Sequence, residues 1–181
     1  ACSMQNDARQ RQNFSLQRRM DRACRYVSDH WFPVNPELLK GIQARLNSGN
    51  YDGGVLQLYR DVQHDFGLFT FMLRKLTEML RAEGALLPEA TPQEVFAVAG
   101  LEQLKILLAI EPHEVSTHAL KTSSTQQAAR LTEALVSASA VEVLATQSGL
   151  DGSFGTSAAL LRQLGLTLIS WNYPGVYERA A

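Results

Sequence analysis

The sequence predicts an all-α protein of about eight helices. Apolar residues recur at three- and four-residue steps along most of the chain, which is the spacing of one helix face. Capping residues precede several of these stretches, and no run alternates polar and apolar residues with the period of two that indicates a strand. The 181 residues, 45% hydrophobic and 19% charged, match the composition of one folded domain with a single core.

Composition also limits the environment that we expect for the chain. No apolar run approaches the roughly 18 residues that a membrane-spanning helix needs, and no signal peptide is visible at the N-terminus. The two cysteines, Cys2 and Cys24, form neither a disulfide framework nor a zinc-ligand set. The sequence therefore predicts a cytoplasmic protein without a membrane span, and it indicates no cofactor.

An arginine-rich amphipathic helix is expected over about residues 8–30, within a separate N-terminal segment of residues 1–31. The six arginines and three aspartates of that segment give it a net charge of +3, whereas the whole chain carries −1. The apolar stripe of the helix should pack on the rest of the chain or on a second copy. That stripe consists of Leu16, Met20, Val27 and Trp31.

Four arginines lie broadly on one side of this helix and are candidate contacts for an anionic partner. They are Arg11, Arg18, Arg22 and Arg25. A solvated face is the simpler interpretation, because the charge is modest and the remainder of the chain is acidic. Nucleic-acid binding through this helix stays a secondary alternative, because such proteins usually present a basic face across the domain.

Capping signals set the starts of the next helices. Asn35 followed by Pro36 begins the second helix, Asp52 caps a short third helix, and Asp65 opens a fourth. Residues 91–94, Thr-Pro-Gln-Glu, form a capping box that begins a fifth helix, and this helix meets the next one at Gly100. We expect the core to contain one set of apolar residues from these and later helices: Leu38, Ile42, Phe69, Leu73, Leu76, Leu104, Leu135 and Leu160.

The C-terminal half is expected to contain two further long helices. Residues 111–123 are polar and are expected to form a loop. Residues 124–147 form a long helix whose small side chains let a neighbouring helix approach closely, and a buried, central position is the simpler interpretation. A glycine-rich turn over residues 149–155 leads to a helix over residues 156–170. Apolar residues crowd residues 160–171 beyond what one helix stripe buries, so we expect exposed apolar surface there.

Three motifs suggest chemistry, and each has a simpler structural interpretation. His64-Asp65 is an HD dipeptide, but Asp65 stands where the fourth helix needs an N-cap. His113 and His118 lie five residues apart, which misses the i, i+4 spacing of a helical zinc motif. The glycine-rich turn lacks the Gly-Lys-Ser/Thr ending of a phosphate loop, so a turn between two helices is expected.

Read as a whole, residues 28–181 resemble the HDOD domain, a helical relative of the HD phosphohydrolases found in bacterial signalling proteins. Four segments in the same order carry the resemblance: residues 32–39, residues 56–76 around His64-Asp65, residues 95–104, and residues 159–165 followed by 173–177. The last of these, Ala-Leu-Leu-Arg-Gln-Leu-Gly, is similar to the family's "G-L-L-H-D-I-G" helix. The later helices of the family have no counterpart before Ala181, so the resemblance implies a domain shortened at its C-terminal end.

The departures from the family bear directly on function. The resemblance places one HD metal-ligand position at Glu133 and the HD pair itself at Arg162 and Gln163. A guanidinium cannot ligate a divalent cation, and an amide is a poor substitute for a carboxylate. Arg162 would either point inward and pair with Glu133, or point outward and leave a site of simple apolar packing. The resemblance therefore implies a non-catalytic signal-transduction or regulatory domain that holds no metal.

Such a domain would act through a protein partner, a fused signalling domain or a small ligand, and a homo-oligomer is compatible with it. The main alternative is a divergent metal-dependent HD-type phosphohydrolase. Its candidate metal ligands are His30, His64, Asp65 and Asp151. This alternative requires those side chains to converge within about 2–2.5 Å of one metal ion.

Overall fold

The computed structural model describes residues 17–18, 21–22, 34–49, 51, 53–85, 89–110 and 125–180. The chain divides into two compact units, Ala1–Trp31 and Phe32–Ala181. In the first unit the four described residues are helical and exposed, and Gln17 Nε2 donates a hydrogen bond to Asp21 Oδ1 at 3.0 Å. The apolar stripe predicted for this unit lies outside the described residues.

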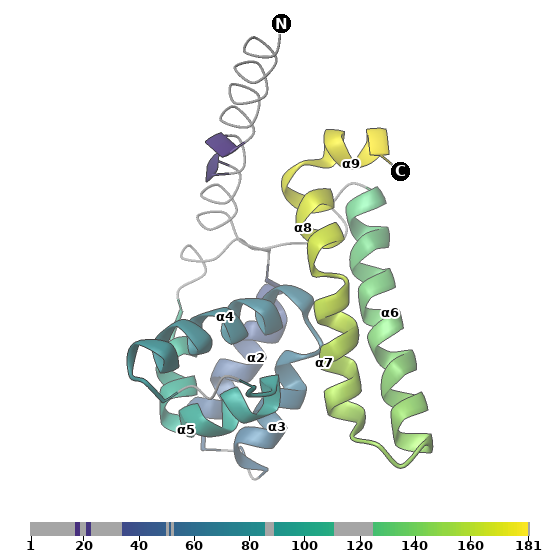
Figure 1. Cartoon of the computed structure of the whole chain (residues 1–181). Helices are drawn as coiled ribbons and strands as arrows, with labels where there is room; N and C mark the ends of the chain where they lie inside the picture. Colours follow the sequence, from purple (N-terminus) through teal and green to yellow (C-terminus); the bar gives the residue numbers. More distant parts are fainter. Residues whose placement is uncertain are drawn as a thin grey trace, which may run out of the picture. The chain divides into compact units, whose positions relative to one another are not determined.

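The second unit confirms the predicted all-α class, because its described residues form eight helices and no strand (Figure 1). The helices are α2 (Pro36–Asn47), α3 (Gly54–Val62), α4 (Phe66–Ala82), α5 (Pro92–Leu108), α6 (Thr125–Gln147), α7 (Gly152–Arg162), α8 (Leu164–Asn172) and α9 (Pro174–Ala180). Within the described residues, no helix combines the length and the hydrophobicity that crossing a membrane requires.

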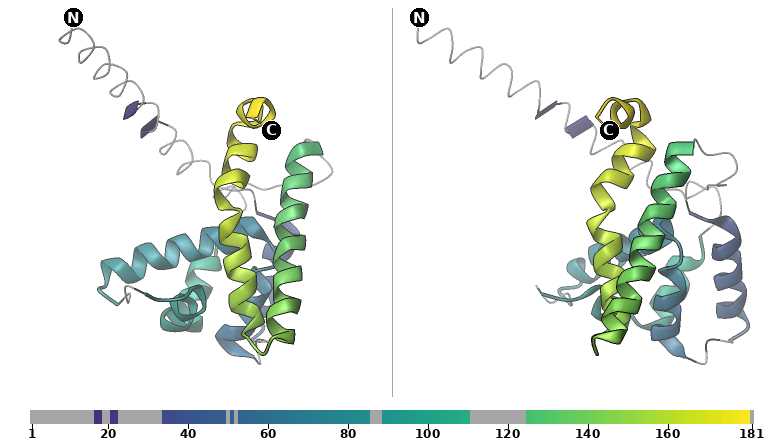
Figure 2. Two further views of the ribbon diagram at one scale, coloured as in Figure 1. Left: turned by 45° about the vertical axis from the view of Figure 1, so that its right-hand side comes forward. Right: turned by 90° about the vertical axis from the view of Figure 1, so that its right-hand side faces the viewer.

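Helices α2 to α5 form one group, and α6 runs antiparallel to the rod formed by α7 and α8 beside it (Figures 1 and 2). The sequence predicted one helix over residues 156–170, and this prediction was wrong in its start and in its continuity. The helix starts at Gly152 because the Asp151 side chain caps it, accepting from Ser153 N at 2.9 Å. A break at Gln163 then separates α7 from α8.

The predicted helix starts at Asn35, Asp65 and Thr91 are confirmed. Asn35 Oδ1 accepts from Glu37 N at 3.0 Å, and Asp65 Oδ1 accepts from Leu68 N at 2.6 Å. Thr91 and Glu94 form the reciprocal capping box of α5. These contacts satisfy backbone N–H groups that have no partner within the first turn of a helix.

Most of the predicted core is buried, in the group formed by α2 to α5 and against α7. Five of the eight residues are inaccessible to solvent or nearly so: Ile42, Phe69, Leu76, Leu104 and Leu160. The other three, Leu38, Leu73 and Leu135, are half-buried because they lie at the edge of their helix stripes. Aromatic rings complete the core; the ring centroid of Tyr59 lies 5.1 Å from that of Phe96.

The long helix predicted over residues 124–147 is confirmed as α6, but it is not buried and central. Helix α6 packs on α7 and α8, and only Leu131, Ala134 and Ala138 are fully buried. On its outer side Val143 and Leu144 are 54% and 63% exposed. The small residues of α6 allow the close approach of a neighbouring helix, α7, as the sequence predicted.

Two glycines of α7 allow α6 to approach closely. A Cβ atom at Gly155 would lie 3.1 Å from Val141 Cγ1 and 3.2 Å from Ala145 Cβ. A Cβ atom at Gly152 would lie 2.5 Å from Thr146 Oγ1. The turn expected between two helices is present, but it is shorter than the predicted residues 149–155, because α7 already begins at Gly152.

Apolar surface remains exposed near the C-terminal end, which confirms the expectation for some of the apolar residues within residues 160–171. Leu160 is fully buried, whereas Leu166 and Ile169 of α8 are 50% and 41% exposed. Thr167 and Ser170 of the same helix are buried instead. Helix α8 thus turns polar residues inward and apolar residues outward, and the remaining apolar residues of the set are half-buried.

Candidate functional site

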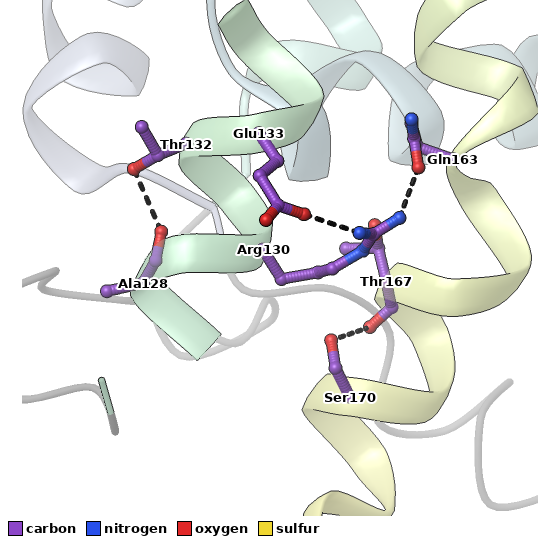
Figure 3. A network of polar contacts seen from close by, with 7 residues as sticks. All are labelled: Ala128, Arg130, Thr132, Glu133, Gln163, Thr167 and Ser170. Carbon is purple, nitrogen blue, oxygen red and sulfur yellow. Dashed lines mark hydrogen bonds and ion pairs between the residues drawn. The ribbon is translucent and has the colours of Figure 1, made fainter. Parts of the chain in front are cut away.

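The structure connects Glu133 and Gln163, two of the positions that the HDOD resemblance singled out, through Arg130 (Figure 3). Arg130 Nη1 lies 2.5 Å from Glu133 Oε2, one turn along α6. Arg130 Nη2 donates to Gln163 Oε1 at the break between α7 and α8. Only 12% of the Arg130 side chain is exposed. A guanidinium thus lies between the two positions and ties α6 to the α7–α8 rod.

Arg162, the third of these positions, does not take part in this network. It is the last residue of α7 and is exposed, while Glu133 pairs with Arg130. The structure therefore has the outward orientation, but the apolar packing expected with it was wrong, because Arg130, Glu133 and Gln163 form a polar network there. The sequence analysis missed Arg130, although its i, i+3 spacing to Glu133 on one helix is the usual geometry of such a pair.

The ligands of the alternative phosphohydrolase site serve other roles or lie apart. Both carboxylate oxygens of Asp65 accept backbone N–H groups, from Leu68 at 2.6 Å and from Asn35 at 3.3 Å. Asp151 caps α7, and His64 is exposed in the turn between α3 and α4. The described residues include no group of three or more histidine, cysteine, aspartate or glutamate side chains that could hold a metal ion.

Several other candidates fall outside the described residues. His30, Arg11 and Arg25 are among them, as is the segment containing His113 and His118. Of the four arginines proposed to contact an anionic partner, Arg18 and Arg22 are described, and both are exposed on a helix.

A buried polar cluster joins α3 to α7, and the sequence analysis did not find it. Tyr59 Oη and Ser157 Oγ share a hydrogen bond, and Gln63 Nε2 donates to Ser157 Oγ at 2.6 Å and to the Ser153 carbonyl at 3.1 Å. Ser153 Oγ donates back to Gln63 Oε1 at 3.2 Å. Burial raises the pKa of the Tyr59 phenol above its ordinary value, so it stays protonated. The four-residue spacing in both pairs, 59/63 and 153/157, was the available signal.

Next to this cluster, α3, α6 and α7 enclose a groove of about 340 Å³. Its lining is mostly polar and includes charges of both signs. The lining residues are Gln57, Arg60, Asp61, Gln63, His64, Leu135, Ala138, Ser139, Glu142 and Thr156. The structure thus brings His64 into a cavity, though with partners that differ from those predicted for a metal site.

The charged residues of the groove fall into two groups. Asp61 is already paired, because Arg45 Nη1 lies 2.9 Å from its Oδ2 and Gln57 Nε2 donates to its Oδ1 at 3.0 Å. In contrast, the side chains of Arg60, His64 and Glu142 make no ion pair or hydrogen bond with the part of the chain that the structure describes. As far as the described residues go, these three side chains are therefore open to a ligand.

A second pocket, of about 530 Å³, lies between α2 and the C-terminal half of α5. Gln43 spans it, donating through Nε2 to the carbonyls of Leu108 at 2.8 Å and Ile110 at 3.1 Å. Ile110 is the last described residue before residue 125, so this pocket adjoins a stretch outside the described residues.

The comparisons with known proteins found no match for this chain: no family model, no curated protein and no solved structure.

Proposed function

We propose that this chain is a non-catalytic regulatory domain of the HDOD type, which acts in cytoplasmic signal transduction by binding a protein partner or a small ligand. One observation carries the proposal: the Arg130 guanidinium lies between Glu133 and Gln163, where the resemblance puts the metal of catalytic relatives. The order of the four sequence segments described above supports the family assignment.

The chemistry of this network supports a role without catalysis. Hydrolysis of phosphoesters by HD-type enzymes needs a bound divalent cation that activates water. Such a cation is held by carboxylates and neutral imidazoles, whose charge offsets its own. At this position Glu133 is neutralised by Arg130, and the guanidinium offers only N–H donors, so it repels a cation rather than ligating it.

Exposed apolar surface supports a binding role. Val143 and Leu144 on α6 and Leu166 and Ile169 on α8 are each more than 40% exposed. Each pair is a small exposed apolar surface on one helix, of the kind that a partner protein covers.

The proposal is tested by metal analysis and a turnover assay on the purified full chain. We expect no stoichiometric metal after dialysis against manganese, and no hydrolysis of bis(p-nitrophenyl) phosphate above that of buffer, with or without manganese. Arg162→Ala is the control for the His64→Ala variant, because Arg162 is exposed and outside the network, and it should behave like the unmodified chain. Stoichiometric metal together with turnover that His64→Ala abolishes would overturn the proposal and establish the phosphohydrolase.

A further inference from the structure

The groove between α3, α6 and α7 is lined by buried polar residues and by exposed charged residues. Its buried lining residues include Thr156 of α7 and Gln63, the residue that follows α3. Arg60 of α3 and His64 of the turn after α3 line the groove, and so do Glu142 and Ser139 of α6. Basic and acidic groups therefore face the same cavity from two helices.

The charge of this cavity selects a ligand with two opposite charges. A ligand with only a negative charge would pair with Arg60, but the Glu142 carboxylate would repel it. A ligand with only a positive charge would pair with Glu142, but the Arg60 guanidinium would repel it. Asp61 adds no free negative charge, because Arg45 and Gln57 already engage it. A zwitterion pairs with both Arg60 and Glu142, so neither ligand charge is left without a partner.

The size and the apolar part of the lining narrow the ligand further. About 340 Å³ lies at the small end of the range for ligand sites, roughly 300–1,000 Å³, so the ligand is small. Leu135, half-buried, and Ala138, buried, form an apolar patch beside the charged groups. This patch suits a short aliphatic side chain and offers no partner to a long charged one.

The groove is also held in shape before any ligand arrives. The hydrogen bonds among Tyr59, Gln63, Ser153 and Ser157 fix α3 on α7, and the close contact at Gly155 fixes α7 on α6. A preformed site loses less conformational entropy on binding, which favours measurable affinity for a small ligand.

We propose that this groove binds a small zwitterion of the amino-acid type with an aliphatic side chain, its carboxylate on Arg60 and its ammonium group on Glu142. The proposal rests on the proposed function, since it names the ligand class of a regulatory domain. It concerns a different part of the molecule from the Arg130 network, so the two proposals can fail separately.

The test is an NMR titration of the full chain with leucine, N-acetylleucine and leucinamide, three probes that share one side chain. Leucine keeps both charges, whereas each derivative lacks one of them. We expect leucine to shift the backbone amide signals of Arg60, His64, Ser139 and Glu142. Each derivative should bind at least about tenfold more weakly than leucine, because it loses roughly one charged contact. N-acetylleucine binding as tightly as leucine, or no shift of these signals at about 10 mM leucine, would overturn the proposal.

Two variants assign the contacts. Arg60→Ala and Glu142→Gln should each raise the Kd for leucine at least about tenfold. Both residues are exposed and without partners in the described part of the chain, so the thermal midpoint should stay unchanged. Arg81→Ala and Glu83→Gln, exposed changes of the same charge at the end of α4, are the matched controls and should bind like the unmodified chain. Unchanged leucine affinity in both groove variants would refute the assignment. Metal-dependent turnover, measured separately, would instead refute the proposed function.

Discussion

Replacing Gln63 by leucine should destabilise the second unit strongly, because this amide connects α3 to α7. The change removes two donated hydrogen bonds, to Ser157 Oγ and to the Ser153 carbonyl, and one accepted from Ser153 Oγ. Each net hydrogen bond contributes about 0.5–1.5 kcal/mol, and the buried Ser153 hydroxyl is left without its acceptor. Leucine recovers part of this loss through its apolar surface. We expect the free energy of unfolding to fall by about 3 kcal/mol.

Urea unfolding followed by circular dichroism measures this loss, and a thermal scan should show the midpoint falling by about 6–12 °C. Gln147→Leu, at the exposed last residue of α6, is the matched control and should change stability by about 0.5 kcal/mol or less. A loss of less than about 1 kcal/mol for Gln63→Leu would refute the reasoning, since it would mean that the polar cluster does not hold α3 on α7.

Three further predictions follow from features of the same unit. Gly155→Ala should cost about 1–3 kcal/mol through overpacking against α6, whereas Gly165→Ala, where a Cβ meets no atom within 4 Å, should stabilise the helix by about 0.5–1 kcal/mol in urea unfolding. Because burial raises the pKa of Tyr59, the contribution of its neutral phenol to the free energy of unfolding should be complete below about pH 10 and fall at higher pH. In a series of unfolding measurements at increasing pH, Tyr59→Phe should remove this part of the decline. Hydrogen bonds from Thr91 lower the pKa of Glu94, so its contribution should be present above about pH 4.5 and fade in acid; a Glu94→Gln variant that kept the same acid dependence would contradict this.

The predictable parts of the fold are those determined by local sequence. Asn35, Asp65 and Thr91 cap helices through contacts within three residues, so neighbouring sequence alone specified them. Gly100, predicted as the meeting point of two helices, has a φ of 74° and kinks α5 there. Such signals do not depend on what packs against the helix.

The position of α6 could not be predicted in the same way. Its small residues fit either a buried central helix or close contact with one neighbour, and periodicity does not separate these cases. The deciding contacts are those of Gly152 and Gly155 with α6, and they depend on how α7 folds back. Burial of Leu135 was overestimated for the same reason, because it borders the groove.

The candidate sites required contacts between residues distant in sequence. The resemblance drew attention to Glu133 and Gln163, and the structure joins them, but through Arg130 rather than Arg162. The groove is lined by Arg60 and Glu142, which belong to separate helices and lie 82 positions apart in the sequence. Neither pair has a local sequence signature, so sequence reasoning found the positions only in part.

The short connection between α6 and α7 has a consequence for the order of folding. Residues 148–151 alone separate the two helices, so their contacts close a short loop, whereas the Tyr59–Ser157 contact spans 98 residues. Short loops cost less chain entropy to close, which favours early formation of the α6–α7 hairpin and late docking of α3. In stopped-flow kinetics, Gln63→Leu should therefore accelerate unfolding and leave the folding rate nearly unchanged, while Gly155→Ala should slow folding. The hairpin would then be the surface on which the rest of the unit assembles.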